Sequence, residues 1–220
     1  MIKIIALSDL HNSISYLESL AEKLSAVDLV LLAGDLTNAG NTQNASDVIE
    51  TIRKYNKSIL AISGNWDGQE IDDFLESEGI NLHGKHIVFR DIAFLGAGGS
   101  LFSGNNTPSE ISETDFDIFL NQANTGIDHH TPKILVCHNP PINTLVDKTW
   151  MNDHVGSKSV RVFIEKTQPL ICFTGHIHEG TGIDTIGVTK IINPGPVWKS
   201  QYAYAEIVEQ SIQCLEIRNF

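Results

Sequence analysis

The sequence predicts an α/β fold in which two mixed β-sheets pack as a sandwich with helices on the outer faces. Short apolar runs alternate with segments of helical periodicity through most of the 220 residues. Two segments, around residues 86–95 and from residue 181 onward, have strand character without an intervening helical pattern. Such segments need strand partners outside one parallel sheet, which favours two sheets over the alternative of a single doubly wound sheet.

The N-terminal part contains three buried strands separated by helical segments. Residues 2–7, 28–33 and 58–63 are short apolar runs of strand length. Between the first two, Ser15 and Glu18 form the pattern of a capping box. The apolar residues at helical spacing are Ile14, Leu17, Leu20, Ala21 and Leu24 in the first helix and Ala45, Val48, Ile49, Ile52 and Tyr55 in the second.

The remaining elements follow from the same periodicities. Residues 86–89 and 92–95 are predicted to pair as antiparallel strands, and residues 133–137 and 170–174 are further buried strands. Ser157 is placed to cap a helix that reaches about Lys166. Another helix contains Phe116, Phe119, Leu120 and Ala123. No repeat, low-complexity tract or linker divides the chain, so one domain spanning residues 1–220 is expected.

Composition restricts the classes of partner. Fifteen basic and 27 acidic residues leave a net charge of −12, which argues against binding to long nucleic acid, where basic side chains neutralise phosphates. The three cysteines are too few and too scattered for a disulfide framework. The apolar run at the N-terminus is too short for a signal peptide or a membrane span. A cytoplasmic protein without membrane contact is expected, and the sequence does not determine its oligomeric state.

A metal-capable side chain follows each of five predicted strands. The carboxyl ends of strands in an α/β sheet share one edge, where ligands bind. Glycine precedes three of these positions, where a sharp turn or a close backbone approach is useful. The sequence has one D-x-H pair and one H-x-H pair. Within each pair, the two side chains project to the same side if the backbone stays extended. The candidate ligands are Asp9, His11, Asp35, Asn65, His138, His176 and His178.

These seven side chains predict a centre with two metal ions. Aspartates and histidines at buried strand ends carry a large desolvation cost unless something pairs with them, and cations do so. Seven ligands are too many for one transition-metal ion, whereas two ions that share a carboxylate use them all. The nitrogen and oxygen donors suit divalent Mn, Fe, Zn, Ni or Co, and the sequence does not decide among these.

The motifs D-x-H, G-D, G-N, a lone histidine after a strand and G-H-x-H occur in this order from Asp9 to His178. This set resembles the calcineurin-like metallophosphoesterases, in particular a small prokaryotic branch that includes predicted phosphodiesterases. Asn193-Pro194-Gly195 is also similar to that branch. The resemblance implies a pair of packed mixed sheets. It also implies a first ion on Asp9, His11, Asp35 and His178, and a second on Asp35 as the bridge, Asn65, His138 and His176.

The implied activity is hydrolysis of a small phosphorylated substrate by a hydroxide that bridges the two ions. Two divalent ions and two aspartates leave a positive centre, which favours an anionic phosphoryl group. The resemblance favours phosphodiesters, cyclic nucleotides among them. Two alternatives remain open: a catalytically weak or inactive binding scaffold with this fold, and a nuclease of the same family, against which the acidic composition argues.

One departure from the family pattern affects the mechanism. Where many members have G-N-H followed by an acidic residue, this chain has Gly64-Asn65-Trp66-Asp67. Trp66 cannot replace the family histidine as a proton donor, because an indole does not titrate. The indole either stacks on a flat part of the substrate or packs within the protein. Asp67 either caps a turn or takes part in catalysis.

His154 is the predicted substitute for the missing general acid. It lies in the long loop before the helix that Ser157 caps. The alternative is a loop histidine that is solvated or caps a neighbouring segment. Asn65, Trp66 and His154 are therefore the expected substrate contacts.

Overall fold

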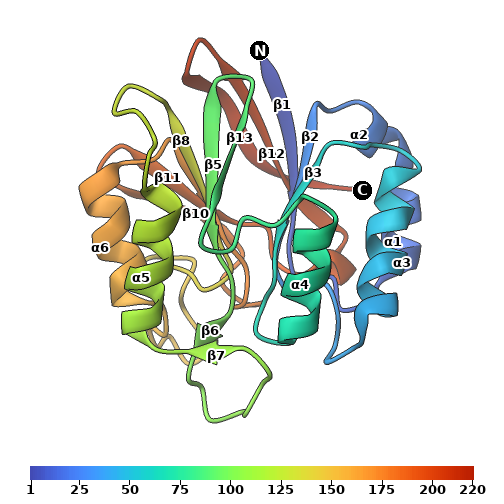
Figure 1. Ribbon diagram of the computed structural model, residues 1–220, viewed down its shortest axis with the longest axis horizontal. Helices are drawn as coiled ribbons and strands as arrows, with labels where there is room; N and C mark the ends of the chain where they lie inside the picture. The colour runs from blue at the N-terminus through green and yellow to red at the C-terminus, as the bar shows by residue number, and fades with distance from the viewer.

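The computed structural model describes residues 1–220, and its two large β-sheets lie face to face (Figure 1). The first sheet has five strands in the order β13-β12-β1-β2-β3. The second has six in the order β10-β11-β9-β8-β5-β4, and β6 and β7 form a separate two-stranded ribbon. The predicted α/β sandwich is confirmed, and the single doubly wound sheet is excluded.

The first sheet joins the two ends of the chain. β1 runs parallel to β2, and β2 parallel to β3, whereas β12 pairs with β1 in the antiparallel sense. The C-terminal tail thus completes the N-terminal sheet. The strands are β1 (Ile2–Leu7), β2 (Leu29–Ala33), β3 (Ile59–Ile62), β12 (Gln201–Val208) and β13 (Ser211–Asn219).

The second sheet contains the middle of the chain. β4 and β5 pair in the antiparallel sense as predicted, and β5, β8, β9 and β11 follow one another in parallel. The strands are β4 (His86–Phe89), β5 (Ile92–Ala97), β8 (Lys133–Cys137), β9 (Ile171–Phe173), β10 (Gly182–Ile186) and β11 (Thr189–Asn193). The ribbon consists of β6 (Ser100–Leu101) and β7 (Glu110–Ile111).

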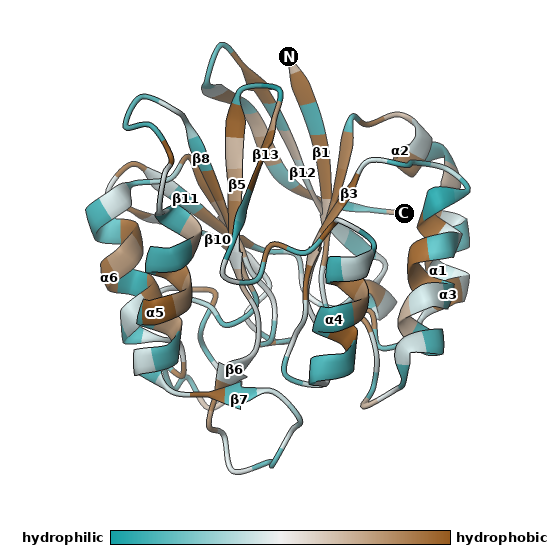
Figure 2. Ribbon diagram, viewed as in Figure 1, coloured by the Kyte–Doolittle hydropathy of each residue, from teal (hydrophilic) through white to brown (hydrophobic).

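Helices cover the outer side of each sheet. α1 to α4 lie on one side of the sandwich and α5 and α6 on the other (Figure 1). Their polar faces point outward, while the strands between them are mostly apolar (Figure 2). The helices are α1 (Ile14–Ser19), α2 (Ala21–Ser25), α3 (Thr42–Arg53), α4 (Gln69–Ser77), α5 (Glu113–Asn124) and α6 (Lys158–Thr167), with a 3₁₀ turn η1 (Val197–Lys199).

The prediction for the segment after β1 is wrong in two respects. The chain forms two short helices that meet at Leu20 instead of one, and the N-cap of α1 is Ser13 without a side-chain bond. The Ser15–Glu18 capping box is absent because the turn begins earlier. Ser13 N–H donates to Leu10 O at 2.8 Å and Ile14 N–H to Asn12 O at 2.9 Å, so the preceding loop decides where the helix begins.

Helix α6 begins as the sequence predicted, whereas helix α4 was not predicted. Ser157 caps α6 as predicted, since its side chain accepts a hydrogen bond from Val160 N–H. α4 has no counterpart among the expected elements. It buries Ile71 and Leu75, and together with Phe74 these residues have the i, i+3, i+4 spacing of an amphipathic helix, so the sequence did contain a signal for this element.

None of these helices combines the length and the apolar composition that crossing a membrane requires.

The central core lies between the two sheets. Ile4 and Ala6 of β1 pack in one cluster with Phe94, Val136 and Phe173 of the second sheet, and all five are fully buried. Separate clusters join α1–α4 to the first sheet and α5 and α6 to the second. Because the sheets are locked by this core, the ends of their strands hold constant positions relative to one another.

Phe173→Ala should lower the free energy of unfolding by about 3–5 kcal/mol, because it removes a fully buried ring from the core between the sheets. Urea unfolding followed by circular dichroism measures the change. Val188→Ala, at a position that is 74% exposed, is the control and should change stability by less than about 0.5 kcal/mol. Equal effects of the two substitutions would contradict this placement of the core.

Candidate metal centre

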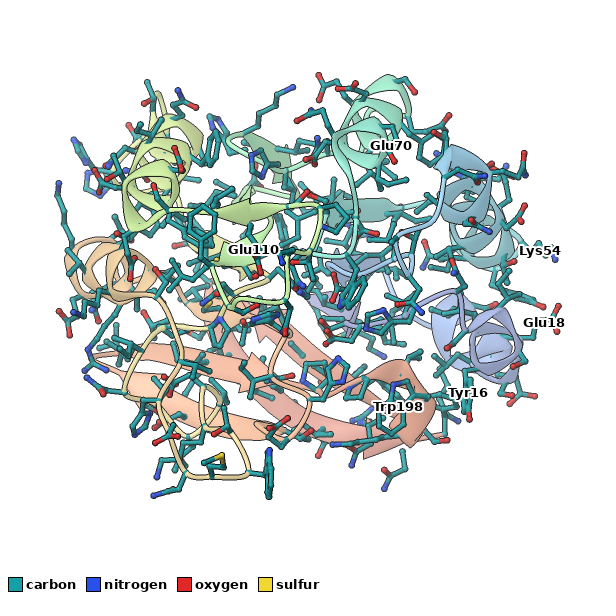
Figure 3. All side chains as sticks on the ribbon, turned by 90° about the horizontal axis from the view of Figure 1, so that it is seen from below. Tyr16, Glu18, Lys54, Glu70, Glu110 and Trp198 are labelled. Atoms are coloured by element: carbon teal, nitrogen blue, oxygen red, sulfur yellow. The ribbon has the colours of Figure 1, made fainter.

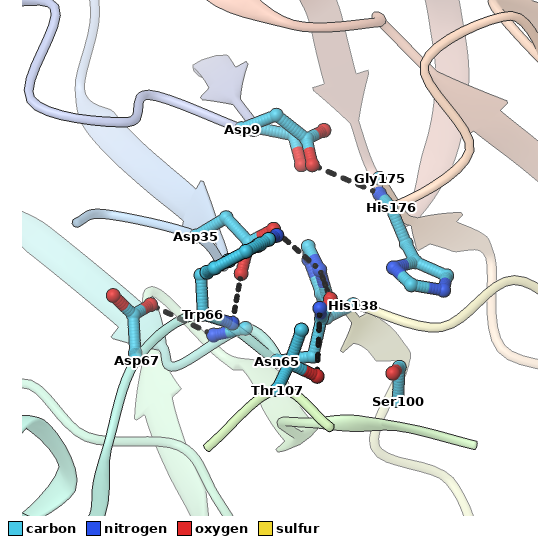
Figure 4. Close-up of polar contacts among 12 residues, drawn as sticks. Asp9, Asp35, Asn65, Trp66, Asp67, Ser100, Thr107, His138, Gly175 and His176 are labelled. Carbon is cyan, nitrogen blue, oxygen red and sulfur yellow. Dashed lines mark hydrogen bonds and ion pairs between the residues drawn. The ribbon is translucent and has the colours of Figure 1, made fainter. Parts of the chain in front are cut away.

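The loops that follow the strands are joined by backbone hydrogen bonds. Asp9 N–H donates to Gly34 O at 3.1 Å and His11 N–H to Asp35 O at 2.9 Å, so the ends of β1 and β2 move together. In the second sheet, Gly175 N–H donates to His138 O at 3.1 Å. The two sets of loops also contact each other, since His176 N–H donates to Asp9 Oδ1 at 3.1 Å, and the strand ends of both sheets thus meet at one edge of the sandwich, as the sequence predicted (Figure 4).

All seven predicted ligands lie at this edge. His178 Nε2 lies 3.3 Å from Asp9 Oδ1, and Asp35 Oδ2 lies 3.3 Å from His138 Nε2 and 3.7 Å from His11 Nε2. The amide oxygen of Asn65 lies 3.1 Å from His138 Nε2. The ring of His176 is 5.2 Å from that of His138, centroid to centroid.

The sequence predicted that an extended backbone directs both side chains of the D-x-H pair, and both of the H-x-H pair, to one side. This prediction is wrong, because the backbone of these loops is not extended. Asp9, His11, Asp35 and His176 have φ angles of 53°, 45°, 50° and 66°. These values lie in the left-handed region, which non-glycine residues seldom occupy. Such strain persists where the surrounding structure imposes it and is concentrated at functional sites. Each of these four ligands reaches the cluster by a sharp turn at its own position.

Two glycines allow this close approach of the loops. Gly34 has a φ angle of +96°, and a Cβ atom there would collide with the imidazole ring of His138. A Cβ on Gly64 would collide with the carboxylate of Asp35. The glycines before the ligands are therefore required by contacts between loops as well as by the turns themselves.

The candidate ligands fit a divalent cation. Asp9 is fully buried, and its Oδ2 atom has no hydrogen-bond partner. Nδ1–H of His138 donates to Ala33 O at 2.7 Å, which leaves Nε2 facing Asp35 and Asn65. Bonding of the second ring nitrogen to a carbonyl is the usual arrangement for a histidine that binds metal. A cation between these nitrogen and oxygen atoms would satisfy the unpaired carboxylate oxygen.

Two groups of three side chains have their ligand atoms within 4.8 Å of one another. Asp9, His11 and His178 form one group, and Asp9, Asp35 and His138 form the other. The groups share Asp9, and Asp35 also contacts a histidine of each group. Each group has the donor atoms to hold a metal ion.

Electrostatic coupling is strong within the cluster. Burial lowers the pKa of His138, but the charge of Asp35 and its hydrogen bond outweigh this effect and raise the pKa to about 9. Burial together with the charge of His138 lowers the pKa of His176 to about 4. Burial would raise the pKa of Asp9, but the hydrogen bond from His178 and the histidine charges lower it below its usual range. Protonated His138 thus supplies some of the positive charge that a bound cation would bring to the cluster.

Asp67 joins two of the loops that carry candidate ligands. It is fully buried, and its carboxylate accepts hydrogen bonds from Leu36 N–H at 2.9 Å, Thr37 N–H at 2.8 Å and Gly64 N–H at 2.8 Å. These bonds join the loop that carries Asp35 to the loop that carries Asn65. Of the two roles considered for Asp67, the structure shows the structural one.

Two further residues hold the candidate ligands in position, although neither was among the predicted site residues. Thr107 Oγ1 accepts a hydrogen bond from Asn65 Nδ2 at 3.1 Å, which directs the amide oxygen of Asn65 toward His138. Asn193 donates to Gly175 O at 3.3 Å and to Ile177 O at 2.9 Å, and so supports the G-H-x-H loop. The Asn-Pro-Gly motif was the signal for Asn193, whereas no local pattern indicates Thr107.

The two expected substrate contacts besides Asn65 are placed as follows. Trp66 donates its backbone N–H to Asp35 Oδ1 at 2.8 Å, and the residue is 37% exposed. His154 Nδ1 lies 2.7 Å from Asp147 Oδ1, and this aspartate is fully buried. His154 is outside both groups of candidate ligands, and its contact with substrate remains a prediction.

Comparisons with known proteins give a consistent result. The family model described as "Calcineurin-like phosphoesterase" matches residues 2–180. The uncharacterized protein MJ1162 of Methanocaldococcus jannaschii is 34% identical over 206 residues, which cover 92% of this chain and 91% of that protein.

Two solved structures share the fold. A dimetal phosphatase from Danio rerio has a TM-score of 0.64 at 14% identity, with 94% of this chain and 93% of that chain covered. An archaeal phosphodiesterase has a TM-score of 0.56 at 15% identity, with 99% of this chain and 100% of that chain covered.

Affinity for Mn²⁺ should rise by up to about tenfold per pH unit between pH 7 and 8.5. Below its pKa of about 9, His138 is protonated in the metal-free protein, so the incoming cation must displace that proton. Calorimetric titration at constant ionic strength measures the slope.

His83→Gln is the control for this slope, because His83 accepts a hydrogen bond from Gly98 N–H and belongs to neither ligand group. It should leave the slope unchanged. An affinity that does not depend on pH would show that His138 gives up no proton to the cation.

Proposed function

The chain belongs to the calcineurin-like phosphoesterase family, and from this we propose that it hydrolyses phosphodiesters with two divalent metal ions. Family membership makes it a metal-dependent phosphoesterase. The number of ions, the preference for diesters and the residues that assist the reaction are the further parts of the proposal. The observation that carries the proposed pair of ions is the grouping of ligands around Asp9 and Asp35.

Each proposed ion has its own set of ligands. Asp9, His11, Asp35 and His178 would hold the first, and Asp35, Asn65, His138 and His176 the second. Two ions bound in this way polarise a phosphoryl group and lower the pKa of a coordinated water. The nitrogen and oxygen donors suit Mn, Fe, Zn, Ni or Co.

Protonation of the leaving oxygen is assigned to His154. Nδ1–H of this imidazole faces the buried carboxylate of Asp147, 2.7 Å away, which leaves Nε2 to exchange a proton. Asp147 is itself held by Thr144 N–H at 2.8 Å and Gly156 N–H at 3.0 Å. A histidine oriented by a buried carboxylate is a common arrangement for a general acid. It would supply the proton that Trp66 cannot.

Several properties favour a small phosphodiester as the substrate and the cytoplasm as the location of this activity. A chain of net charge −12 is unsuited to long nucleic acid, which argues against the nuclease alternative. The three cysteines are unpaired, as in proteins of reducing compartments. An archaeal phosphodiesterase shares the fold, in keeping with a diester substrate. The complete ligand set favours an enzyme over an inactive scaffold.

Asp35→Asn should lower the bound metal and the hydrolysis of bis(p-nitrophenyl) phosphate together, by about 100-fold or more in rate, because the amide removes a charge that both ions share. Elemental analysis and initial rates with added Mn²⁺, Ni²⁺ or Zn²⁺ measure both quantities. Asp91→Asn, at an exposed position in the β4–β5 turn, is the control and should change neither. A metal-loaded wild-type protein that is inert to every phosphate ester tested would support the scaffold alternative.

His154→Ala should slow hydrolysis of 2′,3′-cyclic AMP by about 10²–10⁴-fold, because its alkoxide leaving group needs a proton. Hydrolysis of bis(p-nitrophenyl) phosphate should change much less, since p-nitrophenolate leaves without one. Steady-state kinetics on both substrates measure the contrast, and His130→Ala, at an exposed histidine, is the control. Unchanged turnover of both diesters would remove His154 from the mechanism.

A further inference from the structure

On the basis of the proposed function, we propose that Trp198 is a stacking platform for a planar aromatic group of the phosphate ester, such as a nucleobase. The substrate class would then be nucleotides or aryl phosphates rather than sugar or alkyl phosphates. Trp198 lies on the face of the molecule seen from below (Figure 3). It follows the Asn-Pro-Gly motif and belongs to none of the ligand motifs.

The backbone that carries Trp198 is tied to the metal centre. The turn η1 begins at Val197, which is fully buried and whose N–H donates to Ser8 O at 3.2 Å. Pro196 and Ser8 also form an isolated parallel β-bridge. Ser8 immediately precedes the candidate ligand Asp9. Trp198 is therefore held in a constant position relative to this ligand, which lowers the entropy lost when a substrate stacks on it.

The indole itself contacts a candidate ligand. Its ring centroid is 6.0 Å from that of His178, with an angle of 79° between the planes. His178 is the more exposed of the two histidines in its group, with 36% of its side chain accessible against 14% for His11. Trp198 remains 46% exposed. An ester whose phosphate reaches the ions beside His178 would thus have its substituent within reach of an accessible indole.

Lys199 adds positive charge at the same place. Its ammonium group lies 5.8 Å from the centroid of the Trp198 ring and donates a hydrogen bond to His178 O. The ammonium group therefore lies beside both the indole and the loop that carries His178. A cation beside an aromatic surface suits a ligand that combines a planar ring with an anionic phosphate.

A second exposed tryptophan serves as the matched control. Trp150 is 84% exposed, and its backbone N–H donates to Glu179 Oε1 at 3.1 Å, next to His178 in sequence. Its indole contacts no other aromatic ring of the chain, whereas that of Trp198 packs against His178. Replacing each tryptophan separately distinguishes the proposed platform from a general effect of surface indoles.

The test compares adenosine 5′-monophosphate with ribose 5-phosphate, which differ in the base alone. Calorimetry on the Mn²⁺-loaded protein should show about tenfold tighter binding of the nucleotide. Trp198→Ala should bring the two affinities together without changing the Mn²⁺ content or the affinity for ribose 5-phosphate. Trp198→Phe and Trp150→Ala should keep most of the preference. The nucleotide alone should quench the tryptophan fluorescence.

Two results would overturn the assignment. Equal affinities of the wild-type protein for the two ligands would exclude a base platform, and a preference that survives Trp198→Ala would move it to another residue. Either result can occur while bis(p-nitrophenyl) phosphate is still hydrolysed, so the proposed function would stand. Loss of all metal-dependent phosphate binding and hydrolysis in the wild-type protein would instead refute the proposed function itself.

Discussion

The structure depends on the burial of two carboxylates, Asp9 and Asp35, at the ends of adjacent strands of the first sheet. Both are almost inaccessible to water, so their charge must be compensated within the protein. The second sheet supplies His138 and the first loop supplies His11, each within 4 Å of Asp35. This compensation requires the two sheets to pack with their strand ends at one edge. The fully buried core between the sheets keeps them there.

A layer of hydrogen bonds around the ligands gives the centre its shape. Asp67 joins the loops after β2 and β3, and Asn193 holds the G-H-x-H loop through two of its carbonyl groups. Thr107 orients the amide of Asn65. Four ligands have left-handed backbone conformations, and this conformational strain is balanced by these bonds. Loss of a supporting residue would therefore act on metal affinity through the position of the ligands.

The centre has a buried side and an accessible side. Asn65 and His138 are closed off by the loops around them, whereas His178 lies at the surface beside Trp198 and Lys199. An ester approaching the ions from water meets this second side first. The chain as a whole is acidic, so the attraction of an anionic substrate must arise locally. Bound metal and Lys199 would provide it at the accessible edge.

Periodicity and motif spacing alone determined the α/β class, most of the strands and the seven residues that gather at the strand ends, because burial and ligand chemistry are local properties of a sequence. The left-handed turns at Asp9 and His176 depended on contacts with distant segments, since Asp9 N–H donates to Gly34 O and His176 N–H donates to Asp9 Oδ1. The same holds for the roles of Asp67 and Thr107. Their side chains interact with groups that are distant in sequence, as Thr107 does with Asn65, and no local pattern records such a partner. Only the packing of the two sheets decided which residues became neighbours.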